Sequence, residues 1–260
     1  MAKELEVAIA AAEAAGEVLR SGFGQEQQIE YKGEVDLVTE ADERAEQAIK
    51  EILQDAFPGY EILTEESGRL GGGSGEEARW IVDPLDGTTN YTHALPFFAT
   101  SIALERNGEV VLGVVHDPMA EEMYAAESGQ GATLNGQTIR VTDTNELIRA
   151  LLATSFSHTQ EDMSVGLDLF GRLASLTRGV RQLGSGALDL CYVAAGRLDG
   201  CFERGLSVWD VAAGILMVEE AGGKVSDYQG GEFDLEGTEM VASNGSLHPA
   251  LVSVTSGGGG

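Results

Sequence analysis

Two aspartates three positions apart directly follow an apolar run. Residues 80–82 (Trp-Ile-Val) predict a short buried strand, and Pro84 and Gly87 predict a turn after it. On that turn the carboxylates of Asp83 and Asp86 would leave the strand end together. Two converging carboxylates repel each other and are costly to bury unless a cation neutralises them. Their oxygens suit Mg²⁺ better than Zn²⁺; the alternative is an acid-rich turn in an acidic chain.

More acids stand where such a metal site would need them. Glu65 and Glu66 end a second predicted strand, and Asp210 stands at the head of the apolar segment 211–221. Taken alone, Asp210 fits the N-cap of a helix. Asp42 opens another predicted helix, where it fits a variant capping box. Taken one at a time, these two aspartates are therefore predicted to be structural.

Five segments of the chain together resemble the ordered motifs of the inositol monophosphatase family. They are 36–42, Glu65-Glu66-Ser67, 83–90, Gly184-Ser185-Gly186 and Trp209-Asp210, and they span most of the chain. The resemblance implies an α+β fold, the layered αβαβα sandwich of the inositol monophosphatase and fructose-1,6-bisphosphatase type. It also implies Mg²⁺-dependent hydrolysis of a phosphate monoester.

The same resemblance implies a site for two or three Mg²⁺ ions. Glu65, Asp83 and the backbone carbonyl of Leu85 would hold the first ion. Asp83, Asp86 and Asp210 would hold the second. A third ion would be held partly by Glu65 and mostly by water. Lys32 would match the mobile lysine of the family's metal loop.

Catalytic roles are implied for Thr88, Asp42 and Glu65. Thr88 would orient the attacking water with Asp42 as its carboxylate partner, because a threonine hydroxyl alone is too weak a base. The amides of Gly87 and Thr88 could cradle the phosphate if a helix begins there. Substrate hydroxyls would meet Asp86, Gly184, Ser185, Gly186, Glu203 and Asp210.

The elements that must position these residues are predicted from local patterns. Apolar residues at helical spacing predict helices at 3–20 and 40–57. A β-meander is predicted from 97 to 141, with Asn-Gly hairpin turns at 107–108 and 135–136. Strands and helices then alternate, which favours α+β layers over a doubly wound sheet. With 260 residues and 43% hydrophobic content, the chain can bury a large core.

A soft boundary is predicted near residue 145. The N-terminal α+β half, 1–145, would carry most metal ligands, and the C-terminal α/β half, 146–256, would carry Asp210 and the substrate contacts. The site would then lie between the halves. A glycine-rich surface loop is predicted at 69–77 and a flexible tail at 257–260.

Charge and composition limit the partners and the location. A net charge of −27 repels nucleic acid and anionic membranes, so neither is expected as a partner. Acids within the first apolar stretch exclude a signal peptide, and no apolar run is long enough for a membrane span. We therefore expect a cytoplasmic location. The family resemblance implies a small phosphorylated polyol or sugar as substrate, and a homodimer is expected. Cys191 and Cys201 are expected to be buried free thiols.

The acidic charge is itself unusual. Acids are dispersed along the chain and lysine is scarce, a pattern that resembles proteins of salt-loving cytoplasm, where salt screens the repulsion. An acidic protein from an ordinary source is the alternative. Such a charge would also repel a phosphorylated substrate unless bound cations reverse the local sign.

Among possible activities, hydrolysis of myo-inositol monophosphate leads, and the resemblance also implies inhibition by Li⁺. Residues 88–91 (Thr-Thr-Asn-Tyr) look like an inositol phosphatase, and this disfavours 3′-phosphoadenosine phosphatase. Fructose-1,6-bisphosphatase and histidinol-phosphatase activities remain alternatives on the same scaffold. A non-catalytic regulatory or transcript-processing protein is a further alternative, against which the full set of ligand residues argues.

Overall fold

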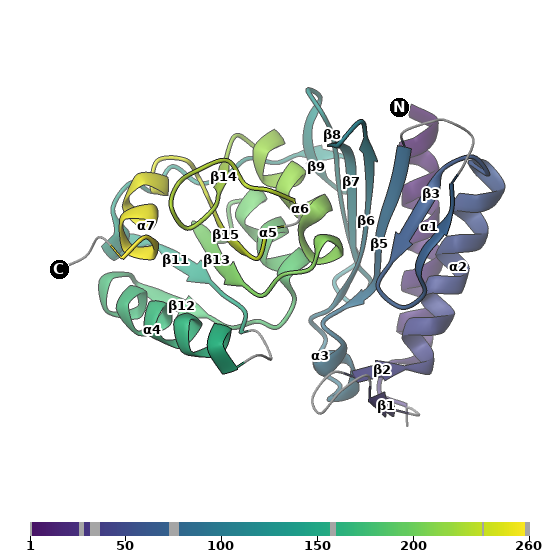
Figure 1. Cartoon of the computed structure of the whole chain (residues 1–260), viewed down its shortest axis with the longest axis horizontal. Coiled ribbons are helices and arrows are strands. Elements are labelled where there is room, and N and C mark those ends of the chain that lie inside the picture. The colour runs from purple at the N-terminus through teal and green to yellow at the C-terminus, as the bar shows by residue number, and fades with distance from the viewer. Residues whose placement is uncertain are drawn as a thin grey trace.

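The computed structural model describes residues 2–25, 29–31, 37–72, 78–156, 160–235 and 237–257. Within them the chain forms two large sheets and three helical layers, in the order α-β-α-β-α (Figure 1). The layered sandwich expected from the sequence is therefore confirmed. No helix in these ranges is both long enough and apolar enough to cross a membrane.

The first helical layer covers the outer face of the larger sheet. Helix α1 (Ala2–Gly22) contacts β6 and β7, and α2 (Glu40–Ala56) contacts β5 (Figure 1). A short hairpin of β1 (Ile29–Tyr31) and β2 (Leu37–Thr39) precedes α2. Both helices form where predicted because their apolar residues recur on one face; Leu19 on α1 and Leu53 on α2 are fully buried.

The larger sheet has eight strands in the order β10-β9-β8-β7-β6-β5-β3-β4. Both Asn-Gly turns of the predicted meander are confirmed, with positive φ at all four residues. Every neighbouring pair is antiparallel except β3 and β5, which are parallel. The strands are β3 (Glu61–Thr64), β4 (Gly68–Gly71), β5 (Ala78–Asp86), β6 (Ala99–Arg106), β7 (Glu109–Asp117), β8 (Glu122–Glu127), β9 (Gly131–Leu134) and β10 (Gln137–Thr138).

Two predictions for this sheet are wrong in part. Strand β5 does not stop before Asp83 but continues to Asp86, with a register shift against β6 between those two residues. Pro84 has no N–H to donate to β6. The strand accommodates it by the register shift and does not turn there. Residues 68–71 form β4 against β3, although a surface loop was predicted from 69; residues 73–77 lie outside the described residues.

The remaining layers come from the second part of the chain. Helices α5 (Gly186–Ala194) and α6 (Val208–Glu220) lie between the two sheets, and α4 (Gln160–Leu176) and α7 (His248–Thr255) cover the far face of the smaller sheet (Figure 1). That sheet runs β12-β11-β13-β15-β14. Its strands are β11 (Leu151–Ala153), β12 (Gly179–Arg181), β13 (Gly200–Arg204), β14 (Lys224–Ser226) and β15 (Glu239–Ser243). The short elements α3 (Thr88–Thr92) and η1 (Leu147–Arg149) complete the fold.

The two sheets share an interior through the middle helices. One apolar cluster joins Ile81 and Val115 of the larger sheet to Met217 of α6 and to Cys201 of the smaller sheet. The division at residue 145 stays a prediction: it falls between β10 and η1, but this cluster is common to both halves. Cys191 and Cys201 are both buried and free, as expected. Of the predicted tail, only Gly257 lies within the described residues.

Acidic groups far outnumber the cations that could pair with them. The 16 Lys and Arg residues cannot match 43 Asp and Glu residues, so at least 27 acids lack a basic partner of their own. Some cations are already committed: Arg197 pairs with Glu122 at 2.6 Å, and Arg204 pairs with both Asp162 and Glu239. The folded chain therefore carries strong repulsion that counterions must screen.

The melting temperature should rise markedly as KCl is increased from 0.01 M to 1 M, because the Debye length falls from about 30 Å to about 3 Å. The measurement is thermal unfolding in the presence of EDTA, so that divalent ions play no part. A flat or falling curve would contradict both the dominance of repulsion and the expected salt-loving source.

Candidate functional site

A cavity of about 540 Å³ opens where the ends of several elements meet. Its lining comes from the ends of β3, β5 and β13, the starts of α3 and α6, and the segments after β11 and before α5. Both sheets and the middle helices therefore contribute to one site. The acids that line it are Glu65, Asp83, Asp86, Glu203 and Asp210.

The parallel pair of β3 and β5 brings Glu65 beside Asp83. The amide of Glu65 donates to the carbonyl of Val82 at 3.2 Å, one step beyond the last ladder pair. Asp83 is 2% exposed, and its Oδ1 accepts a hydrogen bond from the Leu85 amide at 2.9 Å. Burial, followed by the negative charges of the neighbouring acids, raises the pKa of Asp83 well above its ordinary value.

Asp86 is held by the start of α5. Its Oδ2 accepts hydrogen bonds from the Ser185 hydroxyl and from the Ala187 amide, the latter at 2.8 Å. Ser185 is also the N-cap of α5, because its Oγ accepts from the Leu188 amide at 3.3 Å. Burial raises the pKa of Asp86 to about 6, although these hydrogen bonds oppose the rise. The side chain of Ser185 is thus directed at Asp86, and Ser185 does not line the cavity.

Asp210 lies in the first turn of α6, but it is not the N-cap. Ser207 occupies that position, and its amide donates to Oδ2 of Asp210 at 2.7 Å in a capping box. The N-cap prediction is therefore wrong by three residues. Burial, and then the charge of Asp86, raises the pKa of Asp210 well above its ordinary value.

The donor set of this cavity fits a hard cation. Five acids line it. Among the described lining residues Arg204 is the one Lys or Arg, and it is already paired with Asp162 and Glu239. Carboxylate and carbonyl oxygens are the ligands that Mg²⁺ takes in proteins. As the described side chains stand, no three acids, histidines or cysteines close on one point. In this arrangement Oδ2 of Asp86 and Oδ2 of Asp210 are bound by protein donors.

Thr88 and Asp42 lie together, as the family resemblance implied. The Thr88 hydroxyl is 3.3 Å from Oδ1 of Asp42 and 3.0 Å from the carbonyl oxygen of Leu85. A hydroxyl has one proton, so it can donate to only one of these acceptors at a time. Thr88 lines the cavity as the first residue of α3, whereas Asp42, on α2, is fully buried behind it.

Two glycines of the site have close neighbours. Gly87 has a φ of 96°, and a Cβ on it would lie 3.0 Å from the carbonyl oxygen of Gly184. A Cβ on Gly186 would lie 3.0 Å from Oε2 of Glu203. Side chains at these positions would therefore strain the turn before α3 and displace Glu203.

Glu203 of β13 lines the cavity and is 1% exposed. Its Oε2 accepts from the Ser155 hydroxyl at 2.9 Å, but its Oε1 has no hydrogen-bond partner among the described residues. Asp189 of α5 is also fully buried, and neither of its carboxylate oxygens has a hydrogen-bond partner within the residues that the structure describes. Burial raises the pKa of Glu203 to about 7; the Ser155 hydrogen bond opposes this rise and Asp86 adds to it.

Most predicted site residues meet in this one cavity. Lys32 and Asp36 lie outside the described residues, and Asp42 and Ser185 lie directly behind the lining. Arg172, Arg178 and Arg181 do not line the cavity. The predicted residues that line it are Glu65, Asp83, Leu85, Asp86, Gly87, Thr88, Gly184, Gly186, Glu203 and Asp210.

Two residues with structural roles at the site were not predicted. The side-chain amide of Asn90 donates to the carbonyls of Phe97 and Leu183, both at 2.8 Å, and so joins α3 to the segment before α5. Its place within the 83–90 segment was the available signal. Ser155, the donor to Glu203, had no signal, because a single serine after a strand is unremarkable in sequence.

Comparisons with known proteins identify the family of this chain. The profile of the inositol monophosphatase family matches residues 1–257. The inositol-1-monophosphatase of Mesorhizobium japonicum is 45% identical over 252 residues, covering 95% of this chain and 94% of that protein. The Nus factor SuhB of Pasteurella multocida is 41% identical over 242 residues, covering 92% of this chain and 90% of that protein.

A solved structure extends the match to three dimensions. The extragenic suppressor protein suhB from Bartonella henselae superposes with a TM-score of 0.93 at 40% identity, covering 96% of this chain and 97% of that one. The family profile and these relatives each span nearly the whole chain. The chain therefore belongs to the inositol monophosphatase family.

Proposed function

We propose that this chain is a Mg²⁺-dependent phosphomonoesterase that hydrolyses myo-inositol monophosphate to inositol and phosphate. The observation that carries the proposal is that Glu65, Asp83, Asp86 and Asp210 line one cavity together with Thr88. The family of the chain supports it, since the family generally uses Mg²⁺ and one relative is named an inositol-1-monophosphatase. A phosphate monoester is inert enough to need both charge neutralisation and a positioned nucleophile.

The acids of the cavity would hold the cation. Glu65, Asp83 and the Leu85 carbonyl would bind one ion, and Asp83, Asp86 and Asp210 another. Bound Mg²⁺ supplies neutralisation of the phosphate charge and lowers the pKa of a bound water. Without such a cation, five acids in one cavity would repel a phosphate ester.

Thr88 and Asp42 would orient the attacking water. The hydroxyl of Thr88 accepts a hydrogen bond from water when its own proton points to Asp42, 3.3 Å away. The buried Asp42 carboxylate is then the proton acceptor at the end of this chain. The Leu85 carbonyl competes for the same proton at 3.0 Å. Engaging that carbonyl as a ligand would therefore favour the Thr88–Asp42 hydrogen bond.

Glu203 would recognise a hydroxyl of the substrate. Its Oε1 is buried and has no hydrogen-bond partner among the described residues, and a polyol hydroxyl that reached it would satisfy it. Asp86, Asp210 and the 184–186 turn would complete the contacts.

The alternatives on this scaffold differ in what else they bind. Fructose 1,6-bisphosphate carries a second phosphate, which would need a basic partner. Among the described lining residues Arg204 is the one Lys or Arg, and it is already paired. Histidinol phosphate carries an amine, which acidic lining would accept. A monophosphate is therefore favoured over a bisphosphate, and the amine-bearing ester stays in the comparison.

A regulatory role is the second candidate function. The Pasteurella relative is named Nus factor SuhB, and its identity to this chain is close to that of the Mesorhizobium phosphatase. The intact acid set and the Thr88–Asp42 pair support catalysis, and the two roles do not exclude each other.

The protein should release phosphate from myo-inositol 1-phosphate with Mg²⁺ present and not with EDTA. Asp83→Asn should reduce the rate roughly a thousandfold or more, because Asp83 would serve two ions. The assay is phosphate release from a panel that includes fructose 1,6-bisphosphate, histidinol phosphate and p-nitrophenyl phosphate. Near-native turnover by Asp83→Asn would refute the ligand assignment, and no release from any ester would favour the regulatory role alone.

Glu203→Gln should weaken turnover of inositol phosphate at least tenfold more than turnover of p-nitrophenyl phosphate. An unmet buried hydrogen bond costs about 1–3 kcal/mol, and the second ester has no polyol hydroxyl to lose. The measurement is kcat/KM for both esters with wild type and variant, so each substrate controls for the other. Equal losses on the two esters would assign Glu203 a structural role.

In EDTA and 1 M KCl, the free energy of unfolding should fall as the pH rises from 5 to 8. Asp86 and Glu203 have native pKa values of about 6 and about 7, above those of an unfolded chain, so the native state keeps protons that the unfolded state has released. Stability is thus lost through this window. Urea unfolding at each pH tests the prediction. A Glu203→Gln variant should show a shallower decline, and stability that holds or increases up to pH 8 would contradict it.

A further inference from the structure

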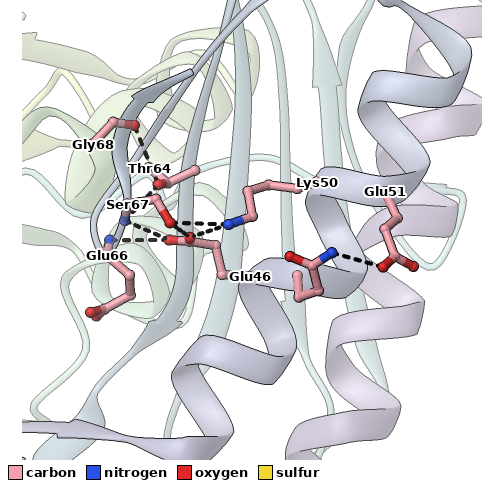
Figure 2. A network of polar contacts seen from close by, with 8 residues as sticks. Glu46, Lys50, Glu51, Thr64, Glu66, Ser67 and Gly68 are labelled. Atoms are coloured by element: carbon pink, nitrogen blue, oxygen red, sulfur yellow. Dashed lines mark hydrogen bonds and ion pairs between the residues drawn. The ribbon is translucent and has the colours of Figure 1, made fainter. Parts of the chain in front are cut away.

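A buried glutamate on α2 holds the turn that carries Glu65. Glu46 is 1% exposed, although it lies on a helix at the surface of the larger sheet. Its Oε2 accepts from the backbone amides of Glu66 and Ser67, at 3.1 and 3.3 Å, and its Oε1 accepts from the Ser67 hydroxyl. Figure 2 shows these contacts reaching from the helix to the turn. One carboxylate therefore binds both residues that follow Glu65.

Lys50 closes the network from the next turn of the same helix. Its Nζ lies 2.9 Å from Oε1 of Glu46 and 3.0 Å from the hydroxyl of Ser67 (Figure 2). The cation compensates the buried charge. Burial acts to raise the pKa of Glu46, but the hydrogen bonds from Ser67 and Lys50 outweigh it, so the pKa is lowered. Thr64 adds a further contact, because its Oγ1 accepts from the Ser67 amide at 3.1 Å. The carboxylate is thus ionised and bound on both oxygens.

The backbone of Glu65 is consequently fixed from two sides. On one side its own amide donates to Val82, which places it against β5 next to Asp83. On the other side Glu46 holds the two amides that follow. The turn between β3 and β4 is short, so these bonds determine where the Glu65 side chain leaves the backbone.

The same helix also carries Asp42. Asp42 and Glu46 are four residues apart, so they lie on one face of α2, and both are buried. Asp42 contacts Thr88 and Glu46 contacts the 65–67 turn. Helix α2 thereby contacts two parts of the site, the water-orienting pair and the Glu65 turn, and fixes their positions relative to each other.

We propose that Glu46 is a positioning residue that sets the place of Glu65 relative to Asp83 and so determines the affinity of the cavity for Mg²⁺. The proposal rests on the proposed function, because it takes Glu65 as a ligand. Glu46 itself does not line the cavity. Residues behind metal ligands commonly change metal affinity about 10–100-fold when they are mutated.

The test is Glu46→Gln, which keeps the size of the side chain but removes its charge. It also replaces one of the two acceptor oxygens with an NH₂ group, which cannot accept a hydrogen bond. Isothermal titration calorimetry should show the Mg²⁺ dissociation constant rising about tenfold or more in the absence of substrate. Phosphate release should require correspondingly more Mg²⁺, and kcat at saturating Mg²⁺ should stay within a few-fold of wild type.

Glu51→Gln is the matched control. Glu51 lies on the same helix and pairs with Gln47 at 2.7 Å, exposed and away from the turn (Figure 2). Glu51→Gln makes the same chemical change, and the Mg²⁺ dissociation constant of this variant should match that of the wild-type protein. A Glu46→Gln protein that unfolds cooperatively and binds Mg²⁺ as wild type does would overturn the proposal.

Ser67→Ala provides a milder variant if Glu46→Gln fails to fold. It removes one donor to Glu46 and leaves both backbone amides, so the Mg²⁺ dissociation constant should rise several-fold; an unchanged constant would overturn the proposal. Failure of the proposed function is distinguishable, because then the wild-type protein itself would neither bind Mg²⁺ nor release phosphate.

Discussion

Repulsion between carboxylates that the fold forces together is the constraint on which this structure depends. Asp83 is almost fully buried, and Glu65, Asp86 and Asp210 all act to raise its pKa. The fold offsets part of that repulsion with backbone amides rather than with basic side chains. The Leu85 amide binds Asp83, the start of α5 binds Asp86, and the start of α6 binds Asp210. Amides of this kind carry partial positive charge without filling the space that a cation and a phosphate would need.

The middle helices therefore serve stability and chemistry together. Val211 and Met217 of α6, with Leu190 of α5, fill the apolar cluster between the sheets. The N-terminal ends of the same helices reach the cavity, where Asp86 and Asp210 bind them. A change that shifts either helix would move an acid of the cavity as well as the core. This coupling explains why the site lies at the ends of packed elements rather than on an independent loop.

Much of this arrangement was readable from local sequence, and the remainder depended on tertiary partners. An acid directly after an apolar run placed Glu65 correctly at the end of β3, whereas Asp83 lies within β5, which continues to Asp86. The course of β5 past Pro84 was not predictable, since the irregularity exists only against β6. Asp210 was assigned to the wrong capping position because N-cap and third helical residue differ only in where the helix begins. Short elements such as β12 and α7 are too brief to show a period.

Glu46 shows most clearly what sequence patterns leave out. In a chain with 43 acids, a glutamate within a helical pattern predicts a solvated face, yet Glu46 is buried and its pKa is lowered, whereas that of Asp83 is raised. The difference is the partner: protein donors surround Glu46, and other acids surround Asp83. Acids that the protein satisfies can support a site, and acids that it leaves to repel one another can bind a cation. For Glu46 and Asp83 the direction of the pKa shift thus differs with the groups around each carboxylate, which residue type and composition do not reveal.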